Sequence, residues 1–130
     1  INSLLYKLKL PIKDKYRLVY DYEDFAKLQM KTVFRENEYP SITPGWDNTA
    51  RRKENYFVLH DSTPDKYRNW LNYIVKNYPW KKKPEPFLFI NAWNEWAEGN
   101  HLEPCQKWGN AYLEATKETL EKVNNSILNE

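Results

Sequence analysis

The chain has 130 residues, of which 41% are hydrophobic and 29% charged, so it is long enough for one globular domain and too apolar for a disordered one. Its formal net charge of +2 gives no support to a nucleic-acid or membrane-surface partner. Its single cysteine excludes an internal disulfide, and no apolar run approaches the roughly 20 residues of a transmembrane helix. Aromatic residues make up 16% of the sequence, and such amphipathic rings suit stacking on sugar faces.

The first half of the sequence alternates predicted strands with predicted helices. An extended run over 16–20 leads into a helix predicted from Tyr22 to about Arg35, with Asp21 well suited as its N-cap residue. This helix has a plausible apolar stripe at helical spacing, formed by Phe25, Leu28, Gln29 and Val33. A short strand is expected around Tyr39 to Ile42, and a further apolar strand over Tyr56 to His60.

The second half continues the same alternation. Thr63 is a good N-cap residue and Pro64 a good first helical residue, so we predict a helix over Pro64 to Asn77. Its predicted buried face consists of Tyr67, Trp70, Leu71, Ile74 and Tyr78. A strand over Phe87 to Ile90 follows, and then a final helix from Pro104, with its packed face at Trp108, Tyr112, Ala115, Thr119, Val123 and Ile127. This order is typical of an α/β fold with parallel strands.

Polar residues crowd together directly after Phe87 to Ile90, a run that we interpret as a strand buried on both faces. The polar residues are Asn91, Asn94, Glu95, Glu98, Asn100, His101 and Glu103. Trp93 and Trp96 stand among them. A solvated loop has no need of two large apolar rings among its charges, so this pattern favours an active site over a plain polar loop. Buried parallel strands of barrel enzymes end in polar segments of this kind, and the chemistry takes place there.

A second informative stretch follows Thr43, where Pro44 and Gly45 predict a turn. Functionally, Trp46 could form the floor of a sugar subsite, Asp47 and Asn48 could bind hydroxyls, and Arg51 could orient a carboxylate. Structurally, Asp47 could instead cap the turn and pair with Arg51 four residues on. The spacing alone favours neither alternative.

Four segments carry a resemblance to a known family, namely PGWDNTARR at 44–52, DSTPDKYRNWL at 61–71, FINAWNEWAEGNHLEP at 89–104 and WGNAYLEA at 108–115. They resemble the C-terminal part of the WbsX-like glycosyltransferase family. That family is associated with bacterial surface-polysaccharide synthesis and is similar to the endo-α-mannosidase glycoside hydrolases, which are (β/α)8 barrels. The resemblance implies the C-terminal portion of a TIM-like barrel, incomplete in this chain because a closed eight-stranded barrel takes roughly 200 residues or more. An N-terminal half or a homo-oligomer would then complete the barrel, and we expect a cytoplasmic location in a bacterium.

The resemblance also implies that Glu95 and Glu98 correspond to the two catalytic carboxylates of the hydrolase relatives. There the first acts as a base on the sugar 2-hydroxyl, giving an anhydro-sugar intermediate, and the second protonates the leaving oxygen and later activates water. Independently of the family, retaining glycosidic cleavage uses two carboxyl groups about 5 Å apart. Close carboxylates among apolar rings favour a protonated state for one member of the pair, and we assign this acid role to Glu98.

The residues that we predict to bind the substrate are Trp46, Asp47, Asn48, Arg51, Asn91, Trp93, Asn94, Trp96, His101 and Glu103. Of these, His101 and Glu103 are the weaker candidates, and Glu103 could instead hydrogen-bond to the reacting groups' neighbours or anchor the last helix. We predict no metal and no cofactor. The segment from His101 to Cys105 superficially resembles a zinc deaminase motif, but the second cysteine that such a site needs is lacking.

Three functional hypotheses follow from these residues. The leading one is a carbohydrate-active enzyme that cleaves or transfers glycosyl groups, with an oligo- or polysaccharide as its partner. The second is a non-catalytic carbohydrate-binding remnant, which a buried cation against Glu95 would favour. The third is a segment that functions only together with an N-terminal half, which exposed apolar strand faces would favour.

Overall fold

The computed structural model describes residues 17–35, 37–82 and 84–127, so residue 16 of the first predicted strand lies outside it. The described part is a mixed α/β structure. Its helices are α2 (Tyr22–Gln29), α3 (Pro64–Asn77) and α4 (Ala111–Ile127), with short 3-10 helices at η1 (Trp80–Lys82) and η2 (Trp96–Glu98). Its strands are β1 (Arg17–Asp21), β2 (Ser41–Ile42), β3 (Trp46–Asp47), β4 (Tyr56–His60), β5 (Phe89–Ile90), β6 (Asn94–Glu95) and β7 (Asn100–His101).

The strands form three small sheets rather than one. β1 pairs with β4 in parallel along five residues, and β3 adds to β4 in antiparallel orientation. β2 and β5 form a second, parallel pair, and β6 and β7 form an antiparallel hairpin. The predicted parallel strands are therefore confirmed for two pairs only. Within the described residues no sheet closes into a barrel, so the predicted partial barrel is not shown.

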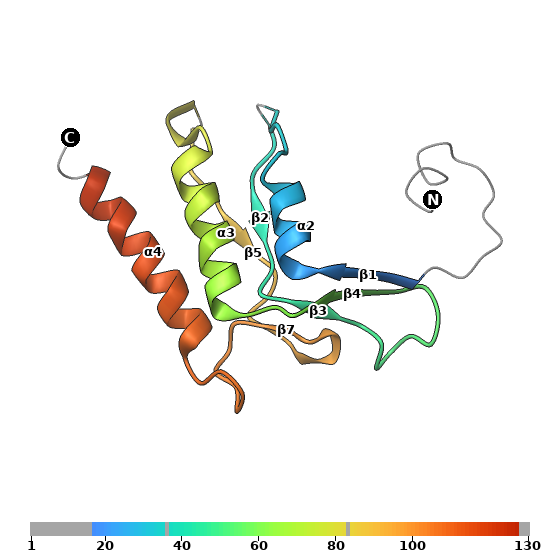
Figure 1. Cartoon of the computed structure of the whole chain (residues 1–130). Helices are drawn as coiled ribbons and strands as arrows, with labels where there is room; N and C mark the ends of the chain where they lie inside the picture. The colour runs from blue at the N-terminus through green and yellow to red at the C-terminus, as the bar shows by residue number, and fades with distance from the viewer. Residues whose placement is uncertain (1–16, 36, 83, 128–130) are drawn as a thin grey trace.

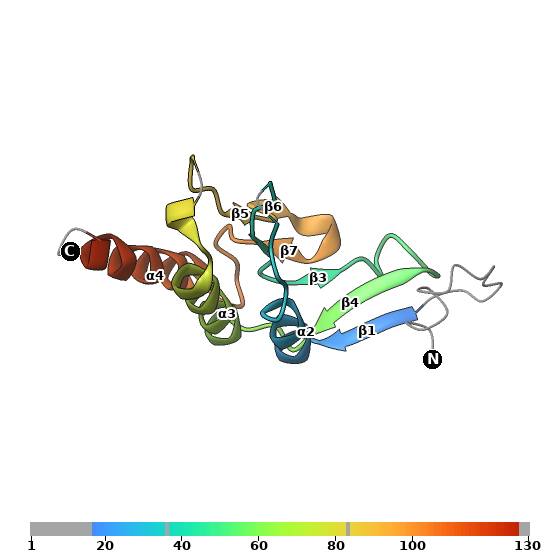
Figure 2. The same cartoon turned by 90° about the horizontal axis from the view of Figure 1, so that it is seen from above.

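The helices α2, α3 and α4 lie side by side in one layer, and β2 and β5 lie behind α2 and α3 (Figures 1 and 2). The hairpin of β6 and β7 lies beyond the end of β2, beside β3 (Figure 2). This arrangement brings the segment 91–103 next to the segment 43–51, although about 50 residues separate them in sequence.

Helix α3 has the predicted bounds, and all five residues of its predicted buried face are buried. Thr63 accepts a hydrogen bond from the backbone N–H of Lys66 and so caps the helix N-terminus, with Pro64 as the first helical residue. α3 packs mainly against α4, where the rings of Tyr67 and Tyr112 meet edge to face with centroids 5.5 Å apart. The hydrophobic core includes residues of both helices, and on the other side of α3 the ring of Trp70 meets Tyr22 of α2.

Helix α2 begins as predicted but ends earlier, at Gln29 rather than Arg35. Asp21 accepts hydrogen bonds from the backbone N–H groups of Glu23 and Asp24, as its N-cap role requires. The predicted apolar stripe is confirmed only for Phe25, which packs against the core, whereas Leu28 is 60% and Val33 90% exposed. The buried residues are instead Tyr22 and Ala26, four positions apart. The run Thr32-Val33-Phe34 has poor helix propensity, and the chain turns so that the ring of Phe34 packs against Tyr78.

Two further boundaries differ from the prediction. The strand expected over Phe87 to Ile90 is reduced to Phe89 and Ile90, and it is not buried on both faces, since Phe87 and Phe89 are about half exposed. Its single hydrogen-bonded neighbour is β2, and in the described residues no layer covers its second face. The last helix begins at Ala111 rather than Pro104, because Cys105 and Gly109 first close a turn through two backbone hydrogen bonds. Gly109 has a φ of 54°, which favours glycine at the turn.

Candidate active site

Both candidate catalytic carboxylates lie on the hairpin of β6 and β7, which we call the carboxylate hairpin (residues 94–101). Glu95 ends β6 and Glu98 ends the short helix η2, so the two side chains leave the backbone within one tight turn. Gly99 then reverses the chain with a φ of 56°, a left-handed conformation that glycine adopts at little cost. The return strand β7 pairs Asn100 with Glu95 and His101 with Asn94.

The carboxylate hairpin rests on the ends of the parallel pair β2 and β5. The backbone N–H of Asn91, directly after β5, donates to the carbonyl of Ile42 at the end of β2. The turn after β2 approaches the hairpin so closely that a Cβ atom on Gly45 would lie 3.3 Å from the carbonyl oxygen of Gly99. The turn after β2 and the hairpin are therefore in direct backbone contact, which Gly45 permits because it has no side chain.

Arg51 reaches both carboxylates from the turn that follows β3. Its Nη1 lies 3.3 Å from Oε1 of Glu98 and 3.9 Å from Oε1 of Glu95. Both Oε1 atoms lie near the same nitrogen, Nη1 of Arg51. The distance between the two carboxylate oxygens therefore cannot exceed the sum of their distances from that nitrogen. The separation of about 5 Å used by retaining glycosidases lies within that limit. Sequence spacing left open a pairing of Arg51 with Asp47, and among the described residues Arg51 pairs with the glutamates instead.

The two carboxylates differ in their exposure to solvent. The side chain of Glu98 is 16% exposed, whereas that of Glu95 is 44% and that of Arg51 57% exposed. Glu98 thus carries the more buried charge and has the shorter contact with the guanidinium.

Trp96, His101 and Glu103 contact one another. The indole N–H of Trp96 donates to Oε2 of Glu103 at 2.6 Å, and its ring is stacked on His101 with centroids 3.8 Å apart. Among the residues that the structure describes, neither ring nitrogen of His101 has a hydrogen-bond partner, although both nitrogens are buried. This burial lowers the pKa of His101, and the charge of Glu103 raises it by a smaller amount.

Two of the predicted substrate-binding residues have structural contacts of their own. Asp47 accepts hydrogen bonds from the backbone N–H and the hydroxyl of Thr49 at 2.9 and 2.6 Å, so it caps the turn. Asn48 is buried, and its Oδ1 accepts from the backbone N–H of Phe57 in β4 at 2.8 Å. These contacts agree with the structural alternative for Asp47 and fix the loop from which Arg51 extends.

The remaining predicted residues divide between exposed and packed positions. Trp93 is 52% and Trp96 48% exposed, so both rings present a face to solvent near the carboxylates. Asn91 and Asn94 are also exposed. Trp46, in contrast, packs against the hydrophobic core with part of its surface and is only partly available as the floor of a subsite.

Sequence reasoning did not assign a role to Asn100, which is completely buried beside the candidate site. Its Oδ1 accepts hydrogen bonds from the hydroxyl of Thr43 at 2.9 Å and from the backbone N–H of Ala92 at 3.2 Å. A strand of two residues is too short to show an alternating pattern, so nothing in the sequence separates Asn100 from its exposed polar neighbours.

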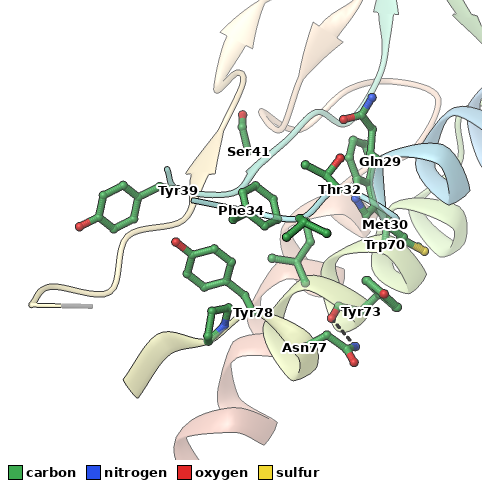
Figure 3. A pocket seen from close by; sticks show the side chains of 13 residues that line it. Gln29, Met30, Thr32, Phe34, Tyr39, Ser41, Trp70, Tyr73, Asn77 and Tyr78 are labelled. Atoms are coloured by element: carbon green, nitrogen blue, oxygen red, sulfur yellow. Dashed lines mark hydrogen bonds between the residues drawn. The ribbon is translucent and has the colours of Figure 1, made fainter. Parts of the chain in front are cut away.

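A pocket of about 430 Å³ lies away from these residues, at the other end of β2 (Figure 3). Its wall is largely aromatic and aliphatic and comes from the C-terminal halves of α2 and α3 and the segment between α2 and β2. None of the predicted site residues lines it. Within the part of the chain that the structure describes, no three His, Cys, Asp or Glu side chains gather closely enough to hold a metal ion. No helix there has the length and apolar character needed to cross a membrane.

Comparison with known proteins supports the resemblance seen in the sequence. The family model described as glycosyltransferase WbsX matches residues 2–116, and the chain therefore belongs to this family. It is also 38% identical over 110 residues to the uncharacterized protein WxcX from two strains of Xanthomonas campestris pv. campestris, B100 and ATCC 33913. The aligned part covers 81% of this chain and 15% of each relative, so the chain spans a small part of the relatives' length. No solved structure matches.

Proposed function

We propose that this chain handles glycosyl groups as a carbohydrate-active enzyme segment, with Glu95 and Glu98 as its reacting pair. The observation that carries the proposal is the shared contact of both glutamates with Arg51, on a segment that also holds the half-exposed residues Trp93 and Trp96. Paired carboxylates supply the acid and the base that glycosidic chemistry needs, and exposed indoles supply apolar faces for sugar rings. Membership in a glycosyltransferase family supports the same class of substrate.

The proposed substrate is a mannose-type oligo- or polysaccharide of bacterial surface-polysaccharide metabolism. In the proposed first step, Glu95 takes the proton of the 2-hydroxyl, the oxygen of that group attacks the anomeric carbon, and Glu98 gives its proton to the leaving oxygen. In the second step, Glu98 takes a proton from water or from an acceptor hydroxyl as that oxygen bonds to the anomeric carbon. The anhydro bond breaks, and Glu95 returns its proton to the 2-oxygen. Water as the nucleophile gives hydrolysis, and an acceptor sugar gives transfer.

Arg51 has a defined role in these two reaction steps. Glu98 can give a proton to the leaving oxygen only when its carboxyl group is free of the Arg51 guanidinium, which lies 3.3 Å away in the chain without ligand. Arg51 therefore has to leave Glu98 when substrate binds, and its exposed position and flexible stem permit this movement. We propose that the guanidinium then hydrogen-bonds to substrate hydroxyls and contacts Glu98 again when that carboxylate is charged.

The test separates the two carboxylates by the leaving group of the substrate. Glu98→Gln should lose turnover of a mannosyl oligosaccharide. With an aryl mannoside, whose phenolate leaves without protonation, it should still release phenolate in the first step and slow only the second step, in which Glu98 is the base. Glu95→Gln should lose turnover of both, because the 2-hydroxyl needs its base in either case. Glu23→Gln is a matched control, since this exposed carboxylate on α2 pairs with Lys27 away from the site. Full turnover in both Glu95→Gln and Glu98→Gln would refute the proposal.

The second candidate function is carbohydrate binding without catalysis. It is favoured by the same contact of Arg51, because the guanidinium already neutralises both carboxylates in the chain without ligand. The cation that would favour this function most strongly is a buried one, and Arg51 is 57% exposed. Calorimetric binding of mannose-type oligosaccharides, with no turnover in the wild-type chain, would support binding alone.

A further inference from the structure

We infer that Asn100 is the positioning residue that fixes the carboxylate hairpin, and with it Glu95 and Glu98, against the ends of β2 and β5. This inference rests on the proposed function of the two glutamates. Asn100 touches neither carboxylate through its side chain amide, and it acts through the backbone of the hairpin. Three observations support this role.

The first observation is the place of Asn100 in the hairpin. It lies directly across from Glu95 in the antiparallel pair of β6 and β7 and follows Gly99, which turns the chain after Glu98. A change in its backbone position is therefore passed to Glu95 through the strand pairing and to Glu98 through the turn.

The second observation is the set of groups that its side chain joins. Oδ1 of Asn100 accepts from the backbone N–H of Ala92, shortly after β5, and lies 2.9 Å from the hydroxyl oxygen of Thr43, directly after β2. The single proton of that hydroxyl is shared with the carbonyl of Gly45 at 2.7 Å. One amide oxygen thus connects the hairpin to the ends of both parallel strands. The carbonyl of Thr43 in turn accepts from the hydroxyl of Tyr22 at 2.6 Å, and Tyr22 is fully buried at the start of α2. The connection therefore reaches the hydrophobic core.

The third observation is the complete burial of the Asn100 side chain. A buried amide that loses its partners has no water to replace them, so the two hydrogen bonds hold it in one position. Its Nδ2 has no partner among the described residues. An apolar residue at this site would avoid burying that unpaired donor, so stability alone does not explain the asparagine. Its oxygen does, because the backbone N–H of Ala92 needs an acceptor and the same oxygen lies within hydrogen-bond distance of the Thr43 hydroxyl.

The alternative is that Asn100 merely fills space in the interior. The two roles differ in what they predict for catalysis. A misplacement of reacting groups by about 1 Å can cost on the order of 100-fold in rate, whereas a loss of global stability leaves the folded fraction with normal turnover. The positioning role predicts a change mainly in kcat, because Trp93 lies outside the hairpin and can still contribute to substrate binding when the carboxylates are displaced.

The experiment compares Asn100→Ala with Asn100→Asp at pH 5. Burial raises the pKa of an aspartic acid at this position, so its neutral form keeps a carbonyl oxygen that can accept both hydrogen bonds. We expect kcat for an aryl mannoside to fall about 10- to 100-fold in Asn100→Ala with KM changed less than about 3-fold, and Asn100→Asp to recover most of the loss. Val75→Ala, at a buried position of α3, is the control for lost stability and should keep kcat.

A second measurement tests the same inference without any turnover. The backbone N–H groups of Leu102 and Glu103 donate to the carbonyl of Trp93, so their hydrogen exchange reports the attachment of the hairpin to the segment after β5. Their protection should fall more in Asn100→Ala than in a Val75→Ala chain of equal global stability, and Asn100→Asp should restore it.

Equal protection in Asn100→Ala and Val75→Ala would overturn the positioning role, whatever the activity. Failure of the proposed function gives a different result. In that case Glu95→Gln and Glu98→Gln would keep full turnover, or no glycoside would be turned over at all. The hydrogen exchange of Leu102 and Glu103 would still show that Asn100 holds the hairpin. A kcat for Asn100→Asp as low as that of Asn100→Ala, with protection equally low, would also contradict the role of the accepting oxygen.

Discussion

Arg51 contacts Glu98 across 47 positions of sequence, with 3.3 Å between Nη1 and Oε1. The contact is possible because Asn48 fastens the start of the Arg51 loop to β4, while the carboxylate hairpin lies against the turn before β3. Two segments that the sequence presents as separate motifs thus become one site. The four predictions below test the contacts that hold this site in place.

Arg51→Gln should leave stability nearly unchanged and impair substrate turnover. A surface ion pair contributes about 0–1 kcal/mol, and Arg51 is more than half exposed, so we expect a loss of less than about 1 kcal/mol in the free energy of unfolding. Turnover of a mannosyl substrate should fall by at least about 10-fold, because the developing negative charge on the glutamates loses its cation. Chemical denaturation and steady-state kinetics measure the two effects.

Arg35→Gln is the matched control for this prediction, because Arg35 is also exposed and lies near a glutamate, Glu38, far from the carboxylate hairpin. Arg35→Gln should change neither the free energy of unfolding nor the turnover of the mannosyl substrate. If Arg51→Gln and Arg35→Gln behaved alike in both assays, Arg51 would have no special part in the site.

Glu103→Ala should release the indole ring of Trp96. The ring is held by a charge-assisted hydrogen bond of 2.6 Å to Glu103 and by stacking on His101. Loss of the bond should lower the free energy of unfolding by about 1 kcal/mol and move the indole N–H resonance of Trp96 upfield in an NMR spectrum. Glu103→Gln retains a neutral acceptor and should give a smaller change in both. An unaltered indole resonance in Glu103→Ala would show that stacking alone orients Trp96.

The pKa of His101 predicts a loss of stability on mild acidification. Burial lowers this pKa below the ordinary value of 6.5, so the unfolded chain takes up a proton at a higher pH than the folded chain. The stabilising effect of a neutral, buried His101 is therefore fully present above pH 6.5 and is lost as the pH falls through the folded pKa. The free energy of unfolding measured between pH 7 and pH 5 should decrease accordingly.

The sequence has only two histidines, so substitutions can isolate this effect. His101→Gln should remove the decrease in the free energy of unfolding that occurs between pH 6.5 and the pKa of His101 in the folded chain. His60→Gln, at the exposed end of β4, should retain this decrease. The hypothesis fails if the pH dependence disappears in His60→Gln and persists in His101→Gln.

Tyr22→Phe should cost more stability than the removal of an exposed hydroxyl. Tyr22 is fully buried, burial raises the pKa of its phenol, and its hydroxyl donates to the carbonyl of Thr43 at 2.6 Å. The substitution leaves that part-buried carbonyl without its donor, and we expect a loss of about 1–2 kcal/mol in the free energy of unfolding. Tyr73→Phe, at a position 40% exposed on α3, should change stability by less than about 0.5 kcal/mol. Equal values for the two variants in urea denaturation would contradict the role of the Thr43 contact.

The sequence alone determined the elements whose signals are local. α3 has its predicted bounds because Thr63 caps it, Pro64 starts it, and its apolar residues recur at helical spacing over fourteen positions. The strand Tyr56–His60 and the N-cap at Asp21 were equally predictable. The family resemblance was readable from the segment at 89–104, and the match over residues 2–116 confirms it.

The tertiary structure decided the features that depend on distant neighbours. The early end of α2, the exposure of Phe89 and the delayed start of α4 follow from packing and turn contacts that no local pattern contains. Asn100 resembles the other polar residues of its segment, and its burial exists only because β2, β5 and the hairpin meet there. The sequence left Arg51 either to orient a carboxylate or to pair with Asp47 four positions before it, and its contacts with Glu95 and Glu98 form only when the chain folds.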